Sequence, residues 1–244
     1  MGKILIVSLI LLPTLVSAFM MSEDEIAVLQ QASTGWSVGE RIAFWAEQFI
    51  GTPYDTDPQG GYVSRKVIIA DERVDCMYHA FRSVELALGK DPTDSLALAL
   101  EKRFHGKGVL EDGKVKNYDD RFRYGEDMLE SGKWGREISS ELGELFTIRG
   151  ERGRDSVAII RKGDVPKMLG NLRNGDIVFF VKDPGKRVSG EIVGHIGIVK
   201  AEEGNVYLIS AFGQKNKGGR VKKTNFSEYS TRMPFIGVRV SRLE

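Results

Sequence analysis

The chain has 244 residues, which is enough for one large domain or two small ones. Its 35 Lys and Arg residues and 34 Asp and Glu residues give a formal net charge of +1, so the sequence lacks the basic excess of a typical nucleic-acid-binding protein. The single cysteine excludes an internal disulfide and leaves three roles open: a reactive thiol, an intermolecular bridge or a buried structural thiol.

The first 18 residues have the pattern of a secretory signal peptide. Lys3 supplies a positive charge, residues 4 to 15 are mostly apolar, and residues 16 to 18 are small enough for a cleavage site. A retained anchor is the alternative, but the apolar run is shorter than the ~20 residues that span a bilayer. No cysteine follows it as a lipidation site. We expect a mature chain of residues 19–244 that is periplasmic or secreted and is not stably inserted in a membrane.

Helix signals dominate the first half of this mature chain. A capping-box spacing occurs at Ser22–Glu25 and again at Ser37–Glu40, and apolar residues follow the second box at helical intervals until Gly51. Asp75 is a good N-cap for an apolar stripe that ends at Gly89. The predicted helices begin near residues 23 and 38 and cover 76 to 88 and 93 to 105.

Strand patterns appear only near the C-terminal end. Residues 106 to 170 are charged and glycine-rich, and we expect them to be irregular with short helices. Together with the helix before them they form an insertion of about residues 90 to 170. The predicted strands cover 176–182, 195–200, 206–211 and 236–240. Lys215 to Lys223 predicts a mobile basic loop, with contact to an anionic polymer as a weaker option. Helices followed by an antiparallel meander indicate a single α+β domain over residues 19–244.

The position of Cys76 favours a nucleophile. A thiol reacts as its thiolate, and a helix N-terminus lowers the pKa of a thiol there. Cys76 directly follows the N-cap Asp75, so we expect it in the first turn of its helix. A buried structural cysteine has no need of that location.

A nucleophilic cysteine needs a base, and the chain has three histidines. His79 lies three residues beyond Cys76 on the same helix face, and His105 lies in a charged, solvated segment. His195 opens a predicted strand, with Gly197 next on its own face, so another group can pack closely there. His195 is therefore the candidate base, although a strand histidine is more commonly structural.

The third member of such a site would orient the imidazole. A hairpin turn around residues 202 to 205 pairs Gly197 with Ser210 and places Ser210 diagonal to His195, ~7–8 Å away between main chains. A serine is short for that gap and would need a water. Gln214 is longer but lies in a loop of unknown path, and either residue is otherwise an ordinary polar side chain.

An ordered set of motifs resembles the NlpC-type cysteine peptidases of bacterial cell-wall turnover, a papain-like superfamily. The motifs are Phe49–Tyr54, Asp75–Cys76, Leu172–Phe180 and Gly194–Val199. The resemblance implies an α+β papain-like fold and a peptidoglycan or muropeptide substrate cut at an amide bond through a thioester, without cofactor or metal. By position it makes Cys76 the nucleophile and His195 the base, puts Ser210 at the third catalytic position, and gives Tyr54 and Asp75 contact with substrate.

A narrower likeness is to the N-acetylmuramoyl-L-alanine amidase-like family, through Tyr118–Tyr124 and Asp127 in the long mid-chain gap. The chain departs from that family's Thr-Thr/Val-Phe-Val-Glu run at Met77–Phe81, and Arg123 stands where a His is usual. Ser210 stands where the superfamily has His, Asn, Gln or Glu. Two other functions stay open: a noncatalytic cell-wall binding module, and a zinc hydrolase whose ligands would be Cys76, His79 and His195.

Overall fold

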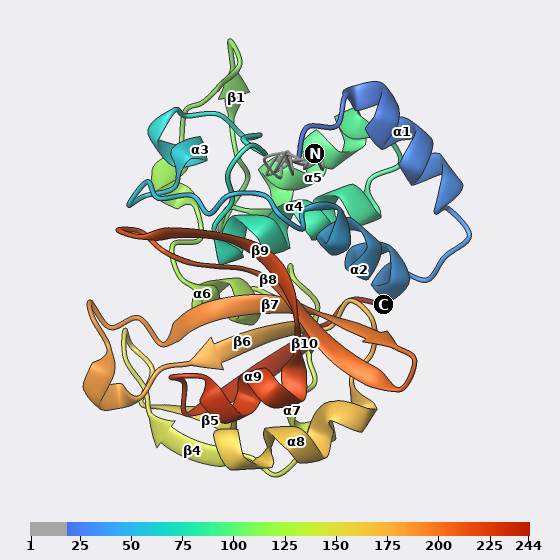
Figure 1. Cartoon of the computed structure of the whole chain (residues 1–244). Coiled ribbons are helices and arrows are strands. Elements are labelled where there is room, and N and C mark those ends of the chain that lie inside the picture. Colours follow the sequence, from blue (N-terminus) through green and yellow to red (C-terminus); the bar gives the residue numbers. More distant parts are fainter. Residues whose placement is uncertain (1–18) are drawn as a thin grey trace, which may run out of the picture.

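The computed structural model describes residues 19–244 (Figure 1). The predicted signal peptide, residues 1–18, lies outside the described part. Within it, no helix is long and apolar enough to cross a membrane. The helices are α1 (Glu23–Ala32), α2 (Val38–Gln48), α3 (Gly61–Ser64), α4 (Cys76–Leu88), α5 (Pro92–Lys102), α6 (Gly125–Glu130), α7 (Ser139–Leu142), α8 (Val165–Met168) and α9 (Phe226–Arg232).

The N-terminal helices begin where the capping residues predict. Ser22 and Ser37 each accept from the main chain three residues on, and Glu25 and Glu40 close both capping boxes. The Oδ1 atom of Asp75 accepts the Tyr78 amide at 2.9 Å, which starts α4 at Cys76. These predicted helix starts are confirmed.

The strands are β1 (Leu110–Glu111), β2 (Lys114–Val115), β3 (Arg136–Glu137), β4 (Phe146–Arg149), β5 (Ser156–Arg161), β6 (Ile177–Val181), β7 (Val193–Glu202), β8 (Asn205–Gln214), β9 (Gly218–Asn225) and β10 (Gly237–Arg242). The main sheet has the order β4-β5-β10-β6-β7-β8-β9, and its pairs are antiparallel. The meander β6 to β9 follows chain order, and β10 returns beside β6. The predicted α+β class is confirmed.

Two sequence expectations about the sheet are wrong. The insertion is not purely irregular, because Ser156–Arg161 forms β5 and pairs with β10 inside the main sheet. The segment Lys215–Lys223 is not a mobile loop, because most of it belongs to β9, which pairs with β8 from Tyr207↔Asn225 to Gln214↔Gly218. Val221 is the apolar residue of β9 and is fully buried, whereas the other seven residues are Gly, charged or polar, so the strand lacks an apolar alternation.

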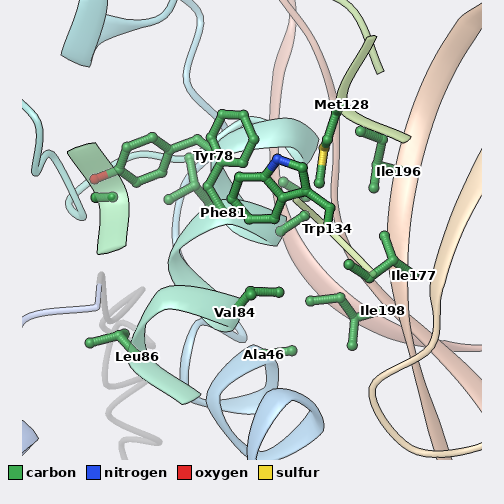
Figure 2. Packing of buried hydrophobic residues seen from close by; sticks show 14 of the residues in the cluster. Ala46, Tyr78, Phe81, Val84, Leu86, Met128, Trp134, Ile177, Ile196 and Ile198 are labelled. Atoms are coloured by element: carbon green, nitrogen blue, oxygen red, sulfur yellow. The ribbon is translucent and has the colours of Figure 1, made fainter. Parts of the chain in front are cut away.

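The sheet separates two apolar layers. On one face, Phe81 and Val84 of α4 lie opposite Ile177 and Ile198 of the sheet, with Trp134 beside Phe81 (Figure 2). The other face is covered by α7, α8 and α9, which lie on the opposite side of the sheet from α2 and α4 (Figure 1). Strand alternation therefore divides β7 as predicted, with Ile196 and Ile198 toward α4 and Val199 toward α9.

The β7–β8 hairpin has the predicted register only over part of its length. Its turn is Glu203-Gly204, both with positive φ, as a two-residue type I′ turn requires. The ladder runs from Glu202↔Asn205 to Ile198↔Ile209, in the expected register, and then stops. Beyond that point β8 continues with β9, and the first residues of β7 continue with β6. The strands part next to His195.

Candidate active site

A cavity of about 400 Å³ lies where β7 and β8 part. The start of α4, the start of β7, the loop after α2, the mid-chain segment 121–125 and the turn after β8 all contribute to its wall. Four of the residues that the sequence singled out line it: Tyr54, Asp75, Cys76 and His195. They come from three separate parts of the chain, since Asp75 and Cys76 are consecutive, and the fold brings them together at one opening.

Cys76 is the first residue of α4 and is half-buried. Burial first, and then the nearby carboxylate of Asp75, raise the pKa of its thiol to about 12. The Ile196 amide and the Lys215 ammonium act in the opposite direction. The expected lowering of this pKa by the helix N-terminus is therefore outweighed by desolvation and by the N-cap charge itself.

His195 lies at the start of β7 among aromatic rings. Its ring centre is 5.1 Å from that of Phe212 and 6.1 Å from that of Phe235, to which it is parallel, and Phe180 and Tyr229 complete the surround. Burial lowers the pKa of this imidazole to about 4. Its Nε2 atom is buried and has no hydrogen-bond partner within residues 19–244. The resting pair is therefore a neutral thiol and a neutral imidazole.

In the part of the chain that the structure describes, no hydrogen bond joins Ser210 or Gln214 to the Nε2 atom of the His195 imidazole. The Ser210 hydroxyl is fully buried and donates to the main-chain oxygen of Ile196 at 2.5 Å. It bridges β8 to β7 just where the ladder has stopped, which fixes the main chain beside His195. Gln214 is exposed at the end of β8, paired with Gly218. Neither residue belongs to the cavity wall.

Tyr54 and Asp75 occupy neighbouring parts of the wall. The main chain of Tyr54 bridges to Val74, and its ring touches the hairpin at Gly213, where an added Cβ would lie 2.3 Å from the ring. Asp75 uses one oxygen as N-cap and receives the Lys215 ammonium on the other at 3.2 Å. The wall also includes Tyr62, whose pKa is raised by burial.

Sequence reasoning missed two residues that bear on the site. Lys215 was assigned to a mobile loop, yet the β8–β9 turn delivers it to the cavity. Glu126 of α6 is fully buried, and its carboxylate accepts the amides of Ile192 at 3.1 Å and Val193 at 3.0 Å, just before His195. The only feature of the sequence that pointed to these hydrogen bonds was the acidic pair Glu126-Asp127 shortly after Tyr124.

The zinc hypothesis finds no support. The Nε2 atom of His79 faces the Ala46 carbonyl at 3.2 Å, and its ring packs edge-on against Phe49 in the interior. No group of three or more His, Cys, Asp and Glu side chains suited to a metal ion occurs in the described part of the chain. His105 is exposed, as predicted.

Comparison with known proteins gives fold neighbours and no sequence relatives. No protein-family profile matches the chain, and no curated protein matches it. A Legionella pneumophila protein of the family DUF1460 has a TM-score of 0.69 at 15% identity, over 89% of this chain and 93% of its own. A Bacteroides uniformis N-acetylmuramoyl-L-alanine amidase has a TM-score of 0.65 at 16% identity, over 85% and 99%. A putative xylanase from Bacteroides fragilis has a TM-score of 0.61 at 18% identity, over 82% and 100%. At these identities the likeness is one of fold.

Proposed function

We propose that this protein is an exported cysteine hydrolase that cleaves an amide bond of peptidoglycan, as an N-acetylmuramoyl-L-alanine amidase or as a stem-peptide endopeptidase. The observation that carries the proposal is that Cys76, at a helix start, and His195, at a strand start, line one cavity. The amidase name of the Bacteroides uniformis structure supports the substrate class. The signal-peptide pattern of residues 1–18 supports a periplasmic or secreted location.

In the proposed reaction His195 takes the thiol proton of Cys76 as the sulfur attacks the amide carbon. The imidazolium then protonates the leaving amine, the C–N bond breaks, and the acyl group remains on sulfur as a thioester. A water molecule, deprotonated by His195, attacks the thioester and releases the carboxylic acid and the thiol. Because both resting groups are neutral, the first proton transfer accompanies attack and is not complete before substrate binds.

The other predicted residues have supporting roles in this proposal. Tyr54 and Asp75 would contact the substrate from the cavity wall, with Asp75 also fixing the helix start. Ser210 would act as a positioning residue through the Ile196 main chain, since its hydroxyl hydrogen is already committed there. The papain-like assignment of the fold is part of the same proposal.

The direct test is digestion of bacterial peptidoglycan with purified protein, followed by mass spectrometry of the released muropeptides. Cleavage at the lactyl-L-Ala bond would free whole stem peptides, whereas an internal cut would leave short stubs on the sugar. Cys76→Ala and His195→Ala should each abolish release, because either change disables the same step. Release by Cys76→Ala at the wild-type rate would refute the cysteine mechanism.

A noncatalytic cell-wall binding module is the second candidate, and the neutral resting state of Cys76 and His195 is the observation that favours it. Such a module would sediment with peptidoglycan, release nothing, and bind equally well as Cys76→Ala. The zinc-hydrolase alternative is tested with a chelator. A chelator would remove the activity of a zinc hydrolase, so activity that survives chelation excludes it.

A further inference from the structure

The turn between β8 and β9 places the ammonium group of Lys215 at the wall of the cavity. β8 and β9 are paired up to Gln214↔Gly218, so Lys215 lies in the connecting turn. Its Nζ atom is 3.2 Å from the main-chain oxygen of Asp55, 3.2 Å from Oδ2 of Asp75 and 5.6 Å from the ring centre of Tyr54. The side chain is half-buried against these three groups.

The carboxylate that Lys215 meets is adjacent to the nucleophile. One oxygen of Asp75 is fixed by the Tyr78 amide, so the other has a defined direction, toward Lys215. The negative charge of Asp75 opposes formation of a second negative charge on the Cys76 sulfur, and the Lys215 ammonium favours it. Partial burial strengthens both effects, because the effective dielectric constant is lower there than in bulk water.

Other charged and titratable groups around the Cys76 thiol have different partners or distant positions. They are Glu191 before β7, His195 on β7, Tyr54 after α2, Tyr229 on α9, and Arg121 and Arg123 on the mid-chain segment. Glu191 is paired with Lys182, Arg121 donates to the Tyr118 carbonyl, and Arg123 is exposed next to Asp119. Across residues 19–244, Lys215 is the cation that bonds to Asp75.

We propose that Lys215 is a positioning residue whose ammonium neutralises the Asp75 carboxylate and thereby stabilises the negative charge that develops on the Cys76 sulfur in the proposed hydrolysis. It does not touch the reacting bond. It acts through Asp75, which must remain at the helix start as N-cap and would otherwise disfavour the nucleophile. The inference rests on the proposed function for its purpose, but its chemistry can be measured without any substrate.

The experiment is the pH dependence of Cys76 alkylation by iodoacetamide in the folded protein, followed by intact mass spectrometry. Because the chain has one cysteine, a single mass increment reports this thiol alone. Lys215→Gln removes the cation, and Lys215→Arg restores it with a different shape. Lys217→Gln is the matched control, because Lys217 lies in the same turn and is exposed. Thermal melting establishes that each variant is folded.

A double-mutant cycle with Asp75→Asn tests the route of action, since Asn caps a helix about as well as Asp. We expect Lys215→Gln to raise the apparent pKa of Cys76 by about one unit, which slows labelling about tenfold below that pKa. Lys215→Arg should recover most of the rate, and Lys217→Gln should match wild type. In the Asp75→Asn background, Lys215→Gln should change the rate less than twofold.

Three outcomes would overturn the proposal. Unchanged labelling in Lys215→Gln would show that the cation has no influence on the thiolate. Faster labelling would show that Lys215 restricts access to the cavity instead. An undiminished effect in the Asp75→Asn background would show that it does not act through Asp75. A failure of peptidoglycan hydrolysis with the expected labelling pattern would count against the proposed function alone.

Discussion

Replacing Glu126 by Gln is expected to destabilise the protein and disturb the strand that carries His195. The fully buried carboxylate accepts the amides of Ile192 and Val193 and is 3.2 Å from the Arg152 guanidinium. In Glu126→Gln one carboxylate oxygen becomes an NH₂ group. An NH₂ group cannot accept a hydrogen bond, so one of the two amides loses its acceptor. The change removes a charge-assisted hydrogen bond, about 1.5–3 kcal/mol, and leaves a buried N–H unpaired, about 1–3 kcal/mol, so we expect a loss of about 3–5 kcal/mol.

The assays are urea and thermal unfolding of the full chain. For a protein of this size each 1 kcal/mol shifts the melting temperature by roughly 2–4 °C, so Glu126→Gln should melt about 10 °C lower than wild type. Glu130→Gln is the matched control, because Glu130 ends the same helix, is 37% exposed and pairs with Arg154, so its loss should cost about 1 kcal/mol or less. Equal melting temperatures of the two variants would contradict the conclusion that the Glu126 carboxylate stabilises the start of β7.

Three further predictions concern titration and the cavity. Burial lowers the pKa of His79 to about 4 from 6.5, so its contribution to stability is present above pH 6.5 and is lost as the pH falls toward 4, by up to ~3 kcal/mol. His79→Gln should reduce this pH-dependent fall in the unfolding free energy. The part that remains comes from His195, whose pKa is also lowered by burial. His105 is exposed, so His105→Gln should leave the fall unchanged. Cys76 in the substrate-free protein should alkylate more slowly at pH 7 than a free thiol, and a faster rate would contradict burial as the dominant influence. Tyr54→Phe should raise KM several-fold with little change in kcat, because its hydroxyl is expected to contact substrate, and an unchanged KM in steady-state kinetics on a muropeptide would contradict that contact.

The features that the sequence predicted correctly depend on local chemistry. A capping box needs only Ser37 and Glu40, and a hairpin turn needs only a break such as residues 202 to 205 between two strand patterns, so both could be recognised without tertiary information. The turn then sets the register of β7 and β8, which puts Ser210 near the His195 strand as expected. The direction of the Ser210 hydroxyl was not predictable from the sequence. Its acceptor is the main-chain oxygen of Ile196, which becomes available only where β7 and β8 separate.

The features that were missed depend on neighbours far away in the sequence. β9 has a single fully buried apolar residue, Val221, and becomes a strand because β8 supplies an edge to pair with. The pKa of Cys76 was expected to be low because the helix N-terminus is visible in the sequence. Burial raises it instead, and burial is a property of the assembled cavity. Lys215 could not be placed for the same reason, since its partner Asp75 is distant in the chain.

The departure from the amidase-like pattern after Cys76 is explained by how α4 is packed. Tyr78, His79 and Phe81 are almost completely buried, and they contact the helices and the buried ion pairs behind α4. Of the run Met77–Phe81, only Met77 lines the cavity. These substitutions therefore change the interior that holds α4 in place, while the thiol keeps its position at the first turn. Because the charged groups nearest the thiol come from the N-cap, the start of β7 and the β8–β9 turn, its reactivity is decided there and not by the residues that follow it on the helix.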